Sequence, residues 1–135
     1  MVRAFQERRD HVVEALNAVD GVSCQMPKGA FYVFPNVGGL CERLGAIELY
    51  EALPADVRPR TSPSTLLQMF LLFRYGVATL DRRAFGVIGS EGRHFLRISV
   101  ATALDDLKEG MERIRVASKD RDGFGAFVRE GRRLS

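Results

Sequence analysis

The sequence is poor in the residues that build metal sites and disulfide frameworks. Its 135 residues include two cysteines, Cys24 and Cys41, and two histidines, His11 and His94. There is no CxxC pair, and the two histidines are too far apart in sequence to indicate a local metal site. We therefore expect two free thiols in a reducing compartment, and no metal.

Long apolar runs and targeting segments are also missing. The longest apolar stretch, residues 66–73, is interrupted by Gln68. It falls well short of the roughly 20 residues that span a bilayer. No signal peptide precedes the cysteines. These features predict a cytoplasmic protein that makes no use of a membrane.

Familiar catalytic motifs are missing as well. No serine lies in the GxSxG context of a nucleophile elbow, and neither histidine lies near an acid in a recognisable pattern. The glycines of residues 86–92 do not follow GxGxxG or P-loop spacing, so an ordinary loop is the better interpretation there.

The charge pattern argues against nucleic-acid binding. The formal net charge is +3, and residues of both signs are mixed along most of the chain. One basic cluster, formed by Arg129, Arg132 and Arg133, lies near the C-terminus. No aromatic residue is interleaved with it to stack on bases, so we expect a solvated terminus.

Hydrophobic periodicity predicts helices over residues 2–19, 41–53 and 62–75. Gly21 and Gly76 are plausible stops for the first and third, and Ser62 is a plausible cap. A fourth helix should follow a capping box formed by Thr102 and Asp105. A last short helix, broken by glycines, is expected within residues 122–132.

Short strands are expected at residues 22–25, 30–34 and 77–80 and around residues 95–100. Residues 54–59 and 81–92 are expected to be loops, the first a candidate mobile insert. The chain length suits one domain. The order of elements predicts an α+β fold, with a small mixed or antiparallel sheet covered by helices on one side.

Arg97 is out of place in its segment. Residues 95–100 (FLRISV) alternate like a half-buried strand, and Arg97 puts a permanent cation where an aliphatic residue is usual. A buried guanidinium without an anion is costly, so a buried Arg97 should face an anion. The alternative, which spacing alone favours, is that Arg97 lies on the solvent face or pairs with a nearby acid.

Three segments together carry a more specific signal. They are the opening helix, residues 5–21; residues 27–37 (PKGAFYVFPNV); and residues 76–102, with GVA, AFG and FLRISVAT in that order. In this order and at these distances they resemble the C-terminal part of the pyridoxal-phosphate-dependent aminotransferases of fold type I, class I and II. The resemblance covers residues 5–116 and implies the α+β small domain of that family.

The resemblance also implies roles for individual residues. The family arginine that corresponds to Arg97 binds the α-carboxylate of an amino-acid or 2-oxo-acid substrate, and a planar guanidinium suits that task. Phe31 and Tyr32 are implied to lie near the substrate entrance, although core packing of a strand explains them equally well. Residues 81–83 (DRR) depart from the Pro-Gly pair of many relatives, so the resemblance implies neither the loop shape nor the side-chain specificity of this chain.

The family's large domain, with the Schiff-base lysine and the cofactor phosphate site, precedes the matched region. None of Lys28, Lys108 and Lys119 lies in a matching motif, so no catalytic or cofactor-binding residue is expected in this chain. A helix that starts at the first residues suggests that the chain was cut from a longer protein. We expect residues 1–118 to form the small domain, and residues 119–135 to form its helical, basic tail.

The resulting expectation is a substrate-carboxylate-binding domain that is inactive alone. In the intact enzyme, a homodimer, it would act with the large domain and pyridoxal phosphate on an amino acid and a 2-oxo acid. The alternative is a stand-alone, non-catalytic module derived from such an enzyme, which binds carboxylates or a protein partner.

Overall fold

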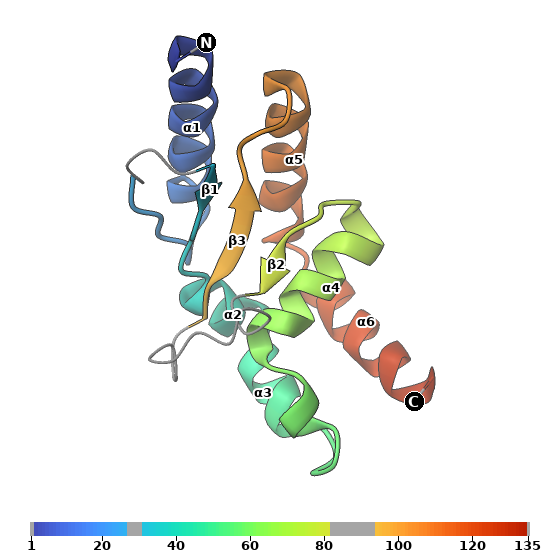
Figure 1. Ribbon diagram of the computed structural model, residues 1–135. Helices are drawn as coiled ribbons and strands as arrows, with labels where there is room; N and C mark the ends of the chain where they lie inside the picture. The colour runs from blue at the N-terminus through green and yellow to red at the C-terminus, as the bar shows by residue number, and fades with distance from the viewer. Residues whose placement is uncertain (1, 27–30, 82–93, 135) are drawn as a thin grey trace.

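The computed structural model describes residues 2–26, 31–81 and 94–134, and for residues 2, 3, 80, 81 and 132–134 it describes the backbone alone. Helices dominate this part of the chain, and a small sheet lies among them (Figure 1). The helices are α1 (Val2–Asn17), α2 (Gly38–Leu44), α3 (Ala46–Glu51), the 3-10 helix η1 (Arg58–Arg60), α4 (Pro63–Tyr75), α5 (Leu104–Ala117) and α6 (Arg121–Leu134).

The sheet has three antiparallel strands in the order β1, β3, β2, which are Tyr32–Val33, Leu96–Ser99 and Leu80–Asp81. Tyr32 pairs with Ser99 on one side of β3, and Leu80 pairs with Arg97 on the other. The predicted α+β fold with a small sheet is therefore confirmed, and the sheet is antiparallel rather than mixed.

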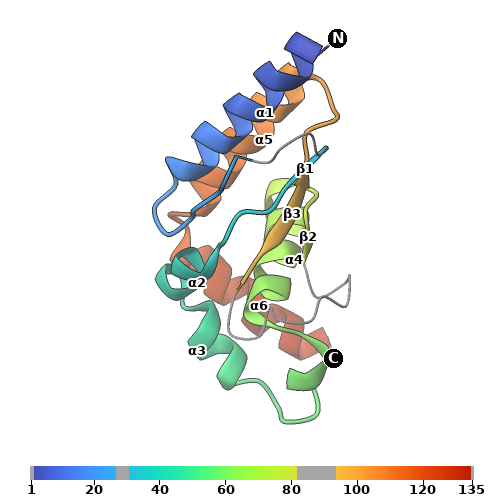
Figure 2. The same cartoon turned by 60° about the vertical axis from the view of Figure 1, so that its left-hand side comes forward.

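The helices divide into two groups around the sheet. Helices α1 and α5 lie side by side, and α2, α3, α4 and α6 gather toward the other end of the molecule in both views (Figures 1 and 2). One continuous core joins them, with side chains from α1, β1, α2, α4, β3, α5 and α6. Its largest fully buried members include Phe70, Phe124, Leu16 and Leu96.

A ladder of hydrogen bonds connects the end of α1 to His94, two residues before β3. The Asn17 side chain bonds both backbone groups of Cys24, each at 2.8 Å. Next to it, the backbones of Ser23 and Asn36 exchange two bonds of 3.0 and 2.7 Å. The Val37 N–H then donates to the His94 carbonyl at 2.7 Å. The residues predicted as a strand at 22–25 thus form one isolated bridge instead of a strand.

Helix α4 agrees closely with its prediction. Ser62 caps it by accepting a bond from the Thr65 N–H at 3.1 Å, and Gly76, at φ 68°, ends it in the left-handed conformation. Among the described residues, no helix is long and apolar enough to cross a membrane.

Two predicted helix boundaries are wrong. The helix expected over residues 41–53 begins earlier, and it breaks into α2 and α3 at Gly45, whose φ of 78° interrupts the helical path. The expected capping box is not formed, because Ala103 rather than Thr102 is the N-cap of α5 and makes no side-chain cap.

Strands and loops also differ from expectation. The strands expected at residues 30–34 and 77–80 are reduced to the two-residue β1 and β2. The loop predicted at residues 54–59 overlaps η1, where the Tyr50 hydroxyl donates to the Arg58 carbonyl at 3.1 Å. Most of the loop predicted at residues 81–92, with the DRR departure, lies outside the described residues.

The glycine-rich C-terminal segment forms one continuous helix, α6, and not a broken one. Asp120 holds its start by accepting bonds from the Gly123 N–H at 3.0 Å and the Tyr75 hydroxyl at 2.7 Å. Phe124 is fully buried edge-on against Phe70, with ring centroids 5.2 Å apart. Buried aromatic packing therefore compensates for the low helix propensity of the glycines.

Gly21, in the turn that follows α1, should tolerate substitution poorly. It has φ 89°, and a Cβ there would lie 2.4 Å from the Leu40 backbone nitrogen. We expect Gly21→Ala to lower the free energy of unfolding by about 2 kcal/mol or more, measured by denaturant unfolding. In the control, Gly110→Ala in the open middle of α5 should raise it by up to about 1 kcal/mol. Equal stabilities for the two variants would contradict the close approach of α1 and α2.

The contact between Tyr75 and Asp120 should make stability fall at high pH. Burial of the hydroxyl, and then its hydrogen bond to Asp120 and the Asp120 charge, raise the pKa of Tyr75 to about 12 from its ordinary value of 10.0. Because the folded state favours the neutral phenol, this contribution is fully present below pH 10 and is lost as the pH rises toward 12.

The effect is measured as the free energy of unfolding in denaturant, below pH 10 and again near pH 12. Tyr75→Phe should lose about 1 kcal/mol at neutral pH, since it lacks the hydrogen bond, and should lack this part of the alkaline decline. An unchanged alkaline decline in the variant would show that another group is responsible.

Candidate functional site: the open face of the sheet

The alternation of β3 fixes the face on which Arg97 lies. Its neighbours Leu96 and Ile98 are buried in the core, at 2% and 5% exposure. Successive side chains of a strand point to opposite faces, so Arg97 lies on the face away from the core. Arg97 itself is half-buried, and its Nε atom is buried.

Tyr32 lies directly beneath the guanidinium. The register places Tyr32 opposite Ser99 on the neighbouring strand, and the Arg97 Cζ is 4.2 Å from the centroid of the Tyr32 ring. A cation at this distance from an aromatic ring gains about 1 kcal/mol, and the ring also limits where the guanidinium plane can lie. The strand pairing thus presents a positioned cation on an aromatic surface.

Phe31 is not part of this arrangement. Its carbonyl accepts a bond from the Val100 N–H at 2.8 Å, and its ring meets Phe5 of α1 edge-on, with centroids 5.4 Å apart. The structure therefore brings Arg97 and Tyr32 together and leaves Phe31 at the border between the sheet and α1.

Phe34 belongs to the same stretch, but it is not among the site residues predicted from the sequence. Tyr32 and Phe34 are 38% and 41% exposed, whereas Val33 and Pro35 between and after them are buried. This alternation places Phe34 on the side of Tyr32. The sequence signal that indicates Phe34 is the alternation with a period of two over residues 32–35.

Among the described residues, the two cysteines are not exposed on this face. Cys24 and Cys41 are free, as predicted, and both are buried. Burial, with a smaller contribution from Glu42, raises the pKa of Cys41 to about 12, so its thiol stays protonated. Among the described residues, no three His, Cys, Asp or Glu side chains are grouped so as to hold a metal ion. On this face Arg97 supplies a positioned positive charge, which is of the kind that suits an anion.

A family model described as aminotransferase class I and II matches residues 1–114. The chain belongs to this family. Its aspartate aminotransferase relative from Rhizobium meliloti (strain 1021) is 40% identical over 114 residues, which are 84% of this chain and 24% of the relative. A probable aspartate/prephenate aminotransferase from Aquifex aeolicus is 36% identical over 120 residues, which are 89% of this chain and 25% of the relative.

Solved aminotransferase structures share the fold. The crystal structure of the Rhizobium meliloti aspartate aminotransferase matches with a TM-score of 0.62 and 35% identity, over 86% of this chain and 25% of that one. The aromatic aminotransferase from Pyrococcus horikoshii matches with a TM-score of 0.62 and 30% identity, over 90% and 26%. The chain thus spans about a quarter of the length of these relatives.

The aminotransferase family depends on pyridoxal phosphate, which needs a lysine amine for its aldehyde and a cradle for its phosphate. In this chain, Lys108 and Lys119 are exposed, on α5 and just after it, and Lys28 lies outside the described residues. These described residues do not fit the cofactor, and we assign no ligand of it to them.

The aromatic contact of Arg97 can be tested against its neighbour. Tyr32→Leu removes the ring beneath the guanidinium, so the buried Nε proton of Arg97 should exchange with water several-fold faster in side-chain NMR. Phe31→Leu is the matched control, because it removes a ring from the adjacent residue. It should leave the exchange of the Arg97 Nε proton unchanged, because Phe31 packs on Phe5. Equal effects of the two variants would show that Tyr32 does not position Arg97.

Proposed function

We propose that this chain is the small, C-terminal domain of a pyridoxal-phosphate-dependent aminotransferase, in which Arg97 holds the α-carboxylate of the amino-acid or 2-oxo-acid substrate. The observation that carries the proposal is the guanidinium of Arg97 seated on Tyr32, on the face of the sheet opposite the core. The family membership supports an amino-acid substrate.

Arginine suits this task by its shape as well as its charge. A guanidinium donates two parallel, charge-assisted hydrogen bonds to a carboxylate, which fixes both the position and the plane of the bound acid. The Tyr32 ring lies under the Arg97 guanidinium and limits its rotation. A substrate held at its carboxylate would be oriented for chemistry elsewhere, which is the contribution of positioning to catalysis.

Tyr32 and Phe34 would form the apolar border of the substrate site. Both are more than one third exposed although their rings are largely apolar, which suits a surface covered when another part of the enzyme closes on it. Closure would exclude water and strengthen the bond between Arg97 and the carboxylate. Phe31, which is 59% exposed and meets Phe5 of α1 edge-on, would extend this border toward α1.

The remaining parts of the site would come from elsewhere in the enzyme. We assign the lysine that binds the cofactor and the phosphate cradle to the large domain, in a homodimer within the cytoplasm. Residues 1–118 form the small domain in this proposal, and residues 119–135 belong to it as a tail. The packing of α6 against α2, α3 and α4 supports that assignment.

A stand-alone module is the second candidate, and the surface weighs against it. Helix α4 exposes Leu72 and Phe73 by 43% and 67%, in addition to the exposed aromatic residues of the sheet. Two exposed apolar regions on one small chain suit a domain that docks on further structure better than an independent monomer.

A chimera tests the proposal. The matched quarter of the Rhizobium meliloti aspartate aminotransferase is replaced by this chain, and amino transfer is measured with pyridoxal phosphate present. Arg97→Lys keeps the positive charge but cannot donate two parallel hydrogen bonds to a carboxylate, so kcat/KM should fall about 100-fold. Arg113→Lys is the matched control and should leave kcat/KM unchanged, because Arg113 is exposed and paired with Glu109 on α5.

Two results would contradict the proposal. One is a chimera in which Arg97→Lys and Arg113→Lys have the same kcat/KM. The other is amino transfer by residues 1–135 alone with added cofactor, since the isolated chain is expected to be inactive.

A further inference from the structure

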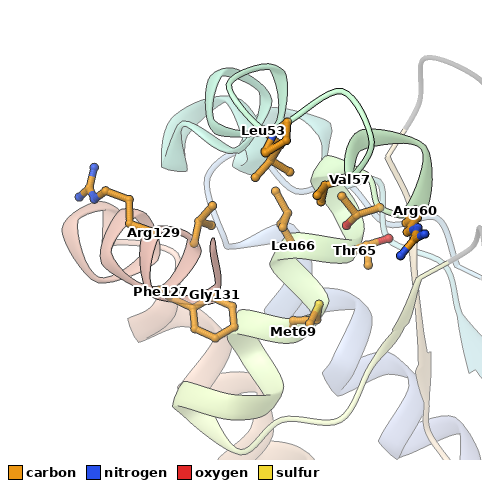
Figure 3. A pocket seen from close by; sticks show the side chains of 12 residues that line it. Leu53, Val57, Arg60, Thr65, Leu66, Met69, Phe127, Arg129 and Gly131 are labelled. Carbon is orange, nitrogen blue, oxygen red and sulfur yellow. The ribbon is translucent and has the colours of Figure 1, made fainter. Parts of the chain in front are cut away.

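A cavity of about 720 Å³ lies between the segment that follows α3, helix α4 and helix α6, away from the sheet (Figure 3). Its walls are mainly apolar, with Leu53, Val57, Leu66 and Met69 on one side and Phe127 of α6 on the other. This volume is in the range of small-molecule sites, and so is the character of the lining.

The cavity owes one wall to a segment beyond the aminotransferase match. The family model ends at residue 114, whereas Phe127, Val128, Arg129 and Gly131 all lie on α6. The opposite wall belongs to the matched region. The cavity is thus made where the C-terminal helix covers α4, and it is separate from the face that holds Arg97.

Two cations border the cavity. Arg60 and Arg129 lie at opposite sides, with Leu66 and Met69 between them (Figure 3). The Arg129 guanidinium points away from the cavity, and Arg60 and Thr65 both line its other side (Figure 3). Within the described part of the chain, Arg60 makes no ion pair, so its charge is available to an anion.

We propose that this cavity binds a free, unbranched aliphatic carboxylate of medium length. The carboxylate is held by Arg60, and the hydrocarbon chain runs along Leu66 and Met69 toward Phe127. The aliphatic walls exclude water from the chain, and the single cation at one end sets its direction. The polar hydroxyl of Thr65 lies at the same end as Arg60.

The methionine methyl groups provide the measurement. Met69 lines the cavity, whereas Met111 is buried on α5 and serves as an internal reference. With methyl-labelled methionine in residues 1–135, decanoate should shift the Met69 signal saturably and leave Met111 in place. Decanol, with the same chain and no charge, should bind roughly tenfold more weakly, because it lacks the charge-assisted bond.

Matched arginine variants test the anchor. Arg60→Gln should bring the affinity for decanoate down to that for decanol. Arg129→Gln, which removes the cation that points away, should leave the preference for decanoate intact. Equal affinities for decanoate and decanol in the unaltered protein would overturn the assignment of a carboxylate, and so would an equal effect of the two variants.

Matched glycine variants test the cavity itself. A Cβ at Gly131 or at Gly110 meets nothing within 4 Å, so both positions on their helices accept a larger side chain. Gly131→Leu projects from the cavity wall and should weaken decanoate binding about tenfold or more. Gly110→Leu on α5 should leave binding unchanged. Full binding by the Gly131 variant, or the absence of any saturable Met69 shift, would overturn the proposal.

Discussion

The antiparallel pairing of β3 with both of its neighbours is the constraint on which the candidate site depends. Because β3 is the middle strand, its backbone is bonded on both sides and cannot slide by one residue without turning Leu96 and Ile98 out of the core. The burial of these two aliphatic residues therefore holds Arg97 on the opposite face. The same register brings Tyr32 beneath it, so hydrophobic burial indirectly positions a polar group.

The two candidate binding regions are formed by different structural elements. The open sheet face consists of residues of the aminotransferase match, and the recognition proposed there is electrostatic. The cavity beside α4 depends on α6 and is mainly apolar. Since they share no lining residue, a change at one is expected to leave the other intact.

Local sequence signals predicted the elements that local interactions determine. Helix α4 followed from Ser62 and Gly76, which act within a few residues of their own positions. The family was identified from segments that include Arg97, and the comparison with known proteins confirms it. The face on which Arg97 lies follows from alternation alone, but its contact with Tyr32 needs the strand register, which joins residues distant in sequence.

The errors came from interactions between distant segments. Residues 22–25 have strand-like composition, yet among the described residues Ser23 forms a single bridge to Asn36 and the backbone of Cys24 bonds the Asn17 side chain, so no strand forms. Gly45 is a local exception, because its left-handed φ of 78° breaks a helix that its neighbours favour. Helix α6 forms in spite of its glycines because Phe124 is buried against Phe70. Periodicity within residues 122–132 cannot reveal that contact, since Phe70 lies on another helix.

The hydrogen-bond ladder from Asn17 through Asn36 to His94 also has a mechanical meaning. The Leu40 N–H adds a further bond by donating to the Gly21 carbonyl at 2.8 Å. Pulling the end of α1 away from the segment before β3 would break these bonds together, so the two segments are expected to open as one unit.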